Sequence, residues 1–422
     1  MTKFALALEP ESDAPVGNGE RHIAPVPRIS IQAFCETTEL AKAVQAAGAD
    51  RRMAKAHIKA QMGGLSGAVE AYRSSATPNV IMVEHSGPAN DLLEGLDRLS
   101  EVCDAGTKVL VVGRLNDIIL YRELVRRGIS DYLISPLQPL DVVRAVSGVF
   151  AAPDAEPVGR VIAVVGAKGG VGASTVAHNI AFSIARDLSL DTVIADLDLP
   201  FGTAGLDFNQ DPPQGVADAV FSPERVDSAF IDRLLSKCTD HLSLLAAPAT
   251  LEREYDFTPD TFDPIVDSMR SSVPYTVLDI PHLWTGWAKH ALISADEVLI
   301  VAAPDLANLR NVKNLFDFVR AARPNDKPPM YLLNQVGMPK RPEVRAADFA
   351  KALGAQPVAT IGFDPQLFGT AANNGQMIAE VSANHKVAET FLSVAMALTG
   401  RAEVKKQKRD FLSPLLAKLR GQ

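Results

Sequence analysis

Residues 161–180 read VIAVVGAKGGVGASTVAHNI, and this stretch decides the fold of more than half of the chain. Its first six residues form an apolar run typical of a buried parallel strand. A glycine-rich turn follows, and a helical pattern begins near Ala173. Such a turn between a strand and a helix cradles phosphate groups, because its backbone N–H groups and the positive helix end face the anion. Position 173, where such a loop normally carries its lysine, is an alanine.

Length and composition bound the rest of the chain. It has 422 residues, 47% of them apolar, and a formal net charge of −8. The length predicts two or three domains, and the negative balance argues against a protein that coats nucleic acid over its whole surface. The three cysteines lie far apart and the eight histidines are scattered, so neither a disulfide framework nor a metal-ligand pattern is expected. The short apolar start is no secretory signal, and no window of about 20 apolar residues occurs, so we expect a cytoplasmic protein.

Strand and helix patterns alternate through residues 28–150, which predicts parallel βαβ units. Strands are expected at 28–34, 79–85, 108–114 and 130–136, and helices at 38–49, 91–103, 117–128 and 139–150. The proline-rich and acidic segment 1–27 predicts a disordered leader. Residues 151–159, AAPDAEPVG, predict a linker between domains.

A second α/β pattern runs from 160 to 400. Its expected strands are 160–166, 191–198, 242–247, 275–280, 297–303, 330–335 and 357–362. The tail, 401–422, has a basic cluster followed by apolar residues at helical spacing, interrupted by Pro414. Two interpretations stay open for this tail: peripheral contact with a membrane, or a disordered or partner-docking segment.

The order of elements in 28–150 resembles the receiver domain of response regulators, which has a flavodoxin-like fold. A receiver needs an acidic pair after its first strand, an aspartate that ends the third and a lysine that ends the fifth. Here Glu84 lies near the phosphoacceptor place, and Ser135 stands where the lysine would be. Without that set, we expect a docking or dimerising module, with Glu84 as a permanent mimic of a phosphoaspartate as the alternative.

The run KGGVGAST, residues 168–175, resembles the deviant Walker A loop of the ParA/MinD family of ATPases. In that family a lysine before the two glycines reaches across a dimer interface to the partner's nucleotide, and Lys168 occupies that place. The family's second lysine corresponds to Ala173. The resemblance implies ATP and Mg²⁺ as ligands, with Ser174 on the metal and the phosphates held by Gly169, Gly170, Val171, Gly172, Ala173, Ser174 and Thr175.

Other segments match the same family in the expected order. Asp198, in IADLDLPFG, corresponds to the switch I acid that positions the attacking water or helps to organise Mg²⁺. Asp279, in YTVLDIPH, corresponds to the Walker B acid that holds the metal, usually through water. Asn334 corresponds to an asparagine that reads the adenine edge, and residues 361–380 to the segment that lines the base pocket. Lys168 and Asp198 are therefore the catalytic candidates.

The alanine at 173 has an expected cost. A charge-assisted lysine–phosphate contact contributes about 1.5–3 kcal/mol, so its loss weakens ATP binding by about one to two decades. Phosphoryl transfer depends more strongly on cations, and one missing positive group costs on the order of 10³-fold in rate. We therefore expect slow or conditional hydrolysis. Trp284 and Trp287 follow switch II and are either core residues or a nucleotide-sensitive partner surface.

Three features together resemble the CpaE/TadZ group of pilus assembly proteins. They are a receiver-like N-terminal domain, a MinD-like domain, and alanine at the position of the loop lysine. That group belongs to the Tad/Flp (type IVc) pilus machinery and helps to place it at a cell pole. The resemblance implies an ATP-state homodimer, other pilus assembly proteins and polar factors as partners, a position at a cell pole or at the inner membrane, and no specific nucleic acid. The alternatives are a scaffold that binds no nucleotide, a partition-type ATPase, and a phosphorylation-driven regulator.

Overall fold

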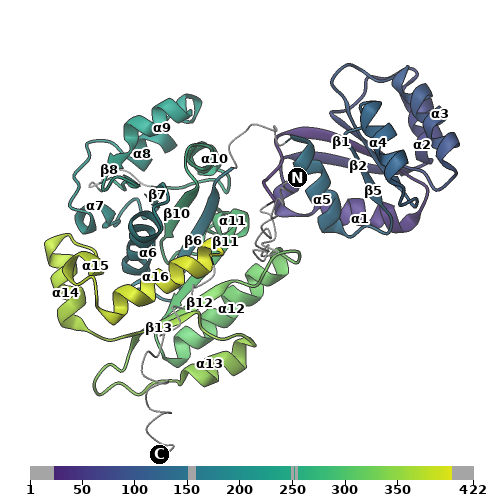
Figure 1. Ribbon diagram of the computed structural model, residues 1–422. Coiled ribbons are helices and arrows are strands. Elements are labelled where there is room, and N and C mark those ends of the chain that lie inside the picture. The colour runs from purple at the N-terminus through teal and green to yellow at the C-terminus, as the bar shows by residue number, and fades with distance from the viewer. Residues whose placement is uncertain (1–22, 151–157, 249–250, 252–254, 402–422) are drawn as a thin grey trace, which may run out of the picture.

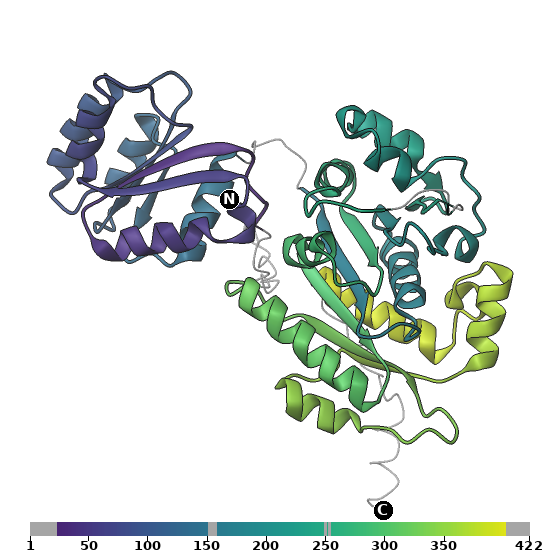
Figure 2. The same ribbon diagram turned by 180° about the vertical axis from the view of Figure 1, so that it is seen from behind.

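The computed structural model describes residues 23–150, 158–248, 251 and 255–401. Two sheets follow one another along the chain, each covered by helices on both faces (Figure 1; Figure 2 shows the opposite side). The expected α/β class with mostly parallel sheets is therefore confirmed.

The first sheet has the order β2-β1-β3-β4-β5, and all its neighbouring strands are parallel. Its strands are β1 Ile29–Cys35, β2 Ala56–Met62, β3 Val80–Glu84, β4 Lys108–Gly113 and β5 Asp131–Ile134. The accompanying helices are α1 Thr38–Gly48, η1 Arg51–Met53, α2 Gly64–Tyr72, α3 Ala89–Ser100, α4 Ile118–Arg126 and α5 Pro139–Phe150.

Two apolar clusters hold this unit together. On one face of the sheet α1 and α5 pack around Leu40, Val44 and Val143, and on the other α2, α3 and α4 pack around Leu96 and Leu124. Strand β3 lies between them and is buried along its whole length. An apolar strand buried on both faces is what a parallel sheet requires.

Residues 50–78, for which no element was expected, form η1, β2 and α2. Strand β2 reads AHIKAQM and lies at the edge of the sheet, with His57, Lys59 and Gln61 exposed. Its apolar side chains alternate with polar ones, so it lacks the continuous apolar run by which the central strands were recognised.

The second sheet has the order β13-β12-β11-β6-β10-β7-β9-β8 and is parallel except for the pair β8 and β9. Its strands are β6 Arg160–Gly166, β7 Thr192–Asp196, β8 Ser236–Lys237, β9 Leu242–Leu245, β10 Tyr275–Ile280, β11 Glu297–Ala302, β12 Met330–Val336 and β13 Ala359–Gly362. All seven strands expected in this part occur at their predicted places, within two residues at each end. The two-residue strand β8 was not expected.

The helices of this part divide between the two faces of the sheet. On one face lie α6 Ala173–Leu188, α14 Pro365–Asn374, α15 Ile378–Val381 and α16 Lys386–Thr399. On the other lie α8 Val216–Val220, α9 Ser228–Leu234, α10 Asp263–Ser272, α11 Gly286–Ser294, α12 Leu306–Ala322 and α13 Ala346–Leu353. The short helices α7 Ala204–Asp207 and η2 Pro223–Arg225 complete the set. The carboxyl ends of β6, β7 and β10 meet at one edge, where ligands bind in open parallel sheets.

The proposed domain boundaries fall partly outside the described residues. The tail beyond 401 and most of the leader and linker, 1–22 and 151–157, lie there. At the end of the predicted leader, Val26 is buried and donates its N–H to Arg52 O at 2.9 Å. Ala24 O accepts a hydrogen bond from Ser147 Oγ at 2.8 Å, so residues 23–27 pack on the first unit. None of the described helices is long and apolar enough to cross a membrane.

Candidate functional site

The glycine-rich loop, residues 167–172, joins β6 to α6 at the carboxyl edge of the second sheet. Gly170 and Gly172 have φ angles of +78° and +82°, which side chains rarely permit. A Cβ atom added at Gly169 or Gly170 would meet no atom within 4 Å, so the backbone there is open. The first turn of the 16-residue helix α6 has backbone N–H groups without partners inside the helix. The loop therefore has the backbone geometry of an anion-binding site.

Three side chains outside the loop donate hydrogen bonds to its carbonyl groups. Asn334 donates its Nδ2 to Val171 O at 2.9 Å, Gln335 its Nε2 to Gly170 O at 2.9 Å, and Asn311 its Nδ2 to Ala167 O at 2.8 Å. Asn334, the expected adenine reader, is buried and is engaged in holding the loop. Since these bonds fix the loop carbonyls, the loop's N–H groups are held in place before any ligand arrives.

A small cavity of about 150 Å³ adjoins the loop. The structure brings together there Gly172, Thr175 and Asn334 with the segment expected to line a base pocket. That segment contributes Phe363, Asp364, Pro365 and Phe368. Aromatic walls with a few polar groups are typical of a small-molecule site.

Lys168 is exposed, whereas Ala173, Ser174 and Thr175 in the first turn of α6 are half-buried. The charge of Lys168 acts on Asp305, which caps α12. Burial would raise the pKa of Asp305, but hydrogen bonds from Asn308 and the charge of Lys168 outweigh it and lower that pKa. The lysine thus stays at the surface of its own subunit, next to an ionised carboxylate.

Three carboxylates lie at the carboxyl ends of two adjacent strands, β7 and β10. Asp196 and Asp279 stand opposite one another in the register of β7 and β10, and Asp198 follows two residues after Asp196. Burial, and then the charge of Asp279, raise the pKa of Asp196 to about 7. Burial is also the largest cause that raises the pKa of Asp198, which accepts the N–H of Phe201 at 3.2 Å. The two predicted metal-site acids therefore share one region with the loop.

A buried histidine that sequence reasoning missed lies in the middle of this cluster. His178, on α6, is fully buried; its Nδ1 lies 2.7 Å from Asp207 Oδ2, and its Nε2 lies 3.3 Å from Asp279 Oδ2 in an ion pair. Burial alone would lower the pKa of His178, but the bonds and charges of Asp207 and Asp279 raise it to about 10. The His178 ring therefore links α7 to the Walker B-like acid Asp279.

The donor set suits a magnesium ion that a nucleotide brings with it. Within the described residues no group of three or more His, Cys, Asp or Glu side chains could hold a metal alone. Mg²⁺ ordinarily takes one or two carboxylates and completes its shell with phosphate oxygens and water. Ser174, Asp198 and Asp279 offer oxygen ligands of that kind beside the loop. When bound, the ion would neutralise charge on the phosphates.

Large apolar side chains are exposed around the same edge. Phe201 and Leu206 follow β7, Leu283 and Trp284 follow β10, and Leu306 begins α12. The two tryptophans differ: Trp287 is buried against Phe262, with ring centroids 4.9 Å apart, whereas Trp284 is 52% exposed. Clusters of exposed apolar groups mark interaction surfaces, so the core interpretation holds for Trp287 and a partner surface remains open for Trp284.

In the first unit, Glu84 is turned inward. Its two carboxylate oxygens accept the N–H groups of Glu36 and Thr37 at 2.7 and 2.8 Å and the Thr37 hydroxyl at 2.7 Å. Glu84 is 1% exposed. A carboxylate committed to the β1–α1 loop holds that loop in place and does not present a phosphate-like charge at the surface.

Comparison with known proteins places the chain. The crystal structure of a pilus assembly protein CpaE from Caulobacter crescentus is 50% identical over 31% of this chain and 100% of its own, with a TM-score of 0.30. An identity of 50% over the full length of that CpaE chain shows that the two proteins are related by sequence. The chain belongs to the CpaE-type pilus assembly proteins. The CpaE match covers the receiver-like N-terminal part.

The loop-bearing half matches other relatives of the CpaE-type chain. Residues 159–330 match a protein family described as an AAA domain. A septum site-determining protein MinD from Synechocystis is 26% identical over 38% of this chain and 60% of its own length. The chain spans about three fifths of the first curated relatives that it matches. The MinD of Pyrococcus horikoshii, solved as a complex with Mg-ADP, is 18% identical over 56% of this chain and 95% of its own, with a TM-score of 0.50, and shows the shared fold. The loop-bearing half of the CpaE-type chain therefore has the fold of the ParA/MinD ATPases.

Proposed function

We propose that the chain is an ATP-binding, dimerising localisation and assembly factor of a Tad/Flp pilus system, with slow or conditional hydrolysis. The observation that carries this proposal is the open, pinned loop 167–172 at the start of α6, with Asp198 and Asp279 at the ends of neighbouring strands. Backbone N–H groups there would hold the phosphates, and Ser174, Asp198 and Asp279 would hold Mg²⁺, with Asp279 acting through water. The Caulobacter crescentus CpaE, a pilus assembly protein, and the Pyrococcus horikoshii MinD complexed with Mg-ADP support the same assignment.

A second copy would complete the site. Ala173 places no charge on the phosphates, and Lys168 is exposed beside Asp305. The apolar residues around this edge, Phe201, Leu206 and Trp284 among them, would be covered when two loops face each other. ATP would then act as a ligand that favours the dimer, because it binds best where the partner's Lys168 supplies the missing cation.

Calorimetry and light scattering test this proposal. The wild-type chain should bind ATP–Mg²⁺ and shift towards a dimer, whereas Lys168→Ala should stay monomeric with ATP. Lys237→Ala, an exposed lysine on the edge strand β8, is the matched control and should behave as wild type. A wild-type dimer fraction that ATP does not change would contradict the dimer, and absence of binding heat would contradict the nucleotide site.

Turnover is tested separately with Asp198→Ala. If Asp198 positions the water or the metal, phosphate release should fall to background in this variant while Asp240→Ala, an exposed acid, retains the wild-type rate. Equal release from wild type and Asp198→Ala would assign the activity to a contaminant.

The ion pair between His178 and Asp279 favours one alternative, a nucleotide-independent scaffold. The His178 ring already lies 3.3 Å from the acid that would hold the metal, and Ala173 removes a phosphate contact. A scaffold would show no heat with ATP–Mg²⁺ and an ATP-independent oligomeric state, so the same two measurements separate the proposals.

The place of action is proposed from the family. We expect a cytoplasmic protein at a cell pole, with other pilus assembly proteins and polar factors as partners, and no specific nucleic acid. Membrane contact is one of the two interpretations of residues 401–422 and stays a prediction, since that tail lies outside the described residues beyond Arg401. Flotation with anionic liposomes should decrease when 401–422 are removed; equal flotation of both chains would exclude that contact.

A further inference from the structure

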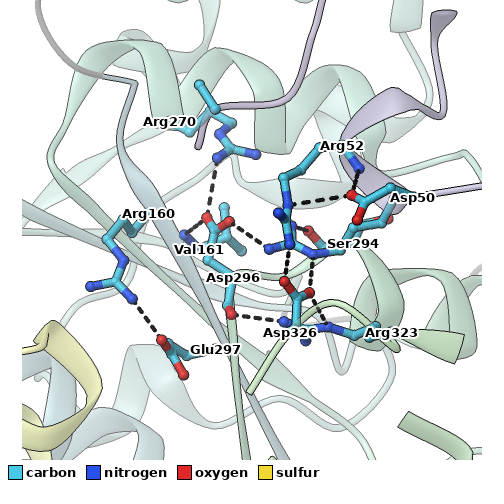
Figure 3. Close-up of polar contacts among 12 residues, drawn as sticks. Asp50, Arg52, Arg160, Val161, Arg270, Ser294, Asp296, Glu297, Arg323 and Asp326 are labelled. Carbon is cyan, nitrogen blue, oxygen red and sulfur yellow. Dashed lines mark hydrogen bonds and ion pairs between the residues drawn. The ribbon is translucent and has the colours of Figure 1, made fainter. Parts of the chain in front are cut away.

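Charged side chains meet between the two units, at the amino ends of β6 and β11 (Figure 3). The phosphate loop lies at the opposite, carboxyl ends of the strands. We call Arg51 and Arg52, with their partners Asp296 and Asp326, the arginine clamp. The two arginines belong to η1 of the first unit, and the two aspartates to the second.

Arg51 makes three contacts with the second unit. Its Nε donates to Asp326 Oδ2 at 2.7 Å, its Nη1 to Ser294 O at 3.0 Å, and its Nη2 to Asp296 Oδ1 at 3.2 Å. One guanidinium therefore connects the last residue of α11, the start of β11 and the segment after α12. A planar fork with several donors can do this, whereas a lysine cannot.

Arg52 and its cap extend the clamp. Arg52 Nη2 pairs with Asp326, and Arg52 Nε lies 3.3 Å from Asp50 Oδ1. The other oxygen of Asp50 accepts a hydrogen bond from Asn325 Nδ2 of the second unit at 2.9 Å. The first unit therefore donates hydrogen bonds to the second through Arg51 and accepts one from it through Asp50.

The second unit holds the acids in place from behind. Arg270 Nη2 donates to Asp296 Oδ2 at 3.1 Å, and Val161 N donates to the same oxygen at 2.9 Å (Figure 3). Arg323 bonds Asp326 Oδ2 at 2.9 Å. Both aspartates are thus fixed by their own unit before the first unit docks.

Burial distinguishes the clamp from a surface ion pair. The side chains of Arg51, Arg52, Asp296 and Asp326 are 8%, 5%, 3% and 11% exposed. A buried charge without its partner is strongly unfavourable, so such groups favour one arrangement over shifted ones. Lys55 and Asp267 also pair across the boundary, but their side chains are 42% and 47% exposed, and such pairs contribute little.

The clamp holds the far ends of two helices that adjoin the phosphate loop. Helix α11 follows the loop that contains His282, whose Nδ1 lies 2.9 Å from Gly166 O. The N-cap of α12 is Asp305, on which the charge of Lys168 acts, and Asn311 of α12 donates a hydrogen bond to Ala167 O. With 17 residues α12 spans about 25 Å, from the loop to the clamp.

We propose that the arginine clamp docks the receiver-like unit on the ends of α11 and α12 in one orientation and thereby couples this unit to the occupancy of the phosphate loop. The proposed docking follows from the contacts alone, whereas the proposed coupling rests on the proposed nucleotide binding. Any shift of these helices on binding must move or strain the docked unit. By linkage, loss of docking must then change nucleotide affinity.

The docking is tested on the nucleotide-free full chain by small-angle X-ray scattering. Arg51→Met should enlarge the radius of gyration, because the first unit is released, while Lys55→Met across the same boundary leaves it unchanged. Arg51→Lys retains the charge but loses the planar guanidinium, and its radius of gyration should lie between those of wild type and Arg51→Met. It keeps the test valid if Arg51→Met does not fold. Circular dichroism verifies folding. An Arg51→Lys or Arg51→Met chain that folds and scatters as wild type would overturn the clamp.

The coupling is tested with a fluorescent ATP analogue and Mg²⁺ on the same chains. Arg51→Met should change the dissociation constant at least threefold, and Lys55→Met should not change it. A released first unit with unaltered affinity would overturn the coupling. If the wild-type chain binds no nucleotide, the proposed function fails, whereas the scattering result still decides the docking.

Discussion

At the scale of single residues, position 173 is the main departure from an ordinary phosphate loop. The loop backbone is pinned by Asn334, Gln335 and Asn311, and the acids Asp198 and Asp279 remain. The alanine therefore removes one charged contact and leaves the surrounding arrangement in place.

Ala173→Lys should consequently strengthen nucleotide binding. If the new ammonium group reaches the phosphates, the affinity for ATP–Mg²⁺ should rise by about one to two decades, which equals about 1.5–3 kcal/mol. Calorimetry on wild type and variant measures it. Unchanged affinity would mean that phosphates do not lie against the first turn of α6.

His178→Ala should destabilise the fold strongly. The substitution leaves Asp207 and Asp279 without their buried partner, and breaking such a buried ion pair costs about 3–5 kcal/mol of the free energy of unfolding. His241→Ala is the matched control, since His241 pairs with Asp191 at the same 2.7 Å but on the surface, and should cost less than about 1 kcal/mol. Chemical denaturation compares them; equal losses would mean that His178 packs as a neutral ring.

At the scale of elements, the sequence predicted the apolar central strands well because each is a nearly continuous apolar run. It failed at edges: β2 alternates short apolar with polar residues, and β8 has two residues. The residues of the candidate site also differ in whether the sequence predicts them. The loop and the strand-end acids follow from a local pattern, whereas His178 acts through Asp207 and Asp279, which are 29 and 101 residues away in the chain. Only the folded chain brings them together.

Gly172→Ala should damage the turn between β6 and α6 in two ways. At φ +82° an alanine is strained by about 1–2 kcal/mol, and its Cβ would lie 2.7 Å from Asn334 Nδ2, which holds Val171. Gly354→Ala at the end of α13, with φ +67° and open space, isolates the strain. Both variants should lose stability in thermal melts, but only Gly172→Ala should lose ATP affinity. Equal ATP affinity in both variants would separate the turn from the ligand site.

At the scale of the whole molecule, two units are joined through buried charges, and the acids of that junction should give it a pH limit. Burial would raise the pKa of Asp326, but Arg51, Arg323 and Arg52 outweigh it and lower that pKa below the ordinary 3.8. A lowered folded pKa means that the contribution is complete above the unfolded value and disappears as the pH falls through the folded one.

Docking of the two units should therefore persist from pH 8 to about 4 and weaken below it. Scattering curves at pH 7, 5 and 3.5, together with circular dichroism, follow the junction separately from global unfolding. In Asp326→Asn the radius of gyration should be enlarged already at pH 7 and should change less with acid. Opening of the wild type between pH 7 and 5 would contradict this assignment.

The edge strand β2 has a consequence for how the chain behaves when crowded. An unpaired strand edge is a template for growth of the sheet into a neighbouring molecule. The exposed His57, Lys59 and Gln61 put polar groups and a positive charge at alternate positions along that edge. Like charges would meet if two such edges approached. We therefore expect this edge to resist pairing with the same edge of a second copy.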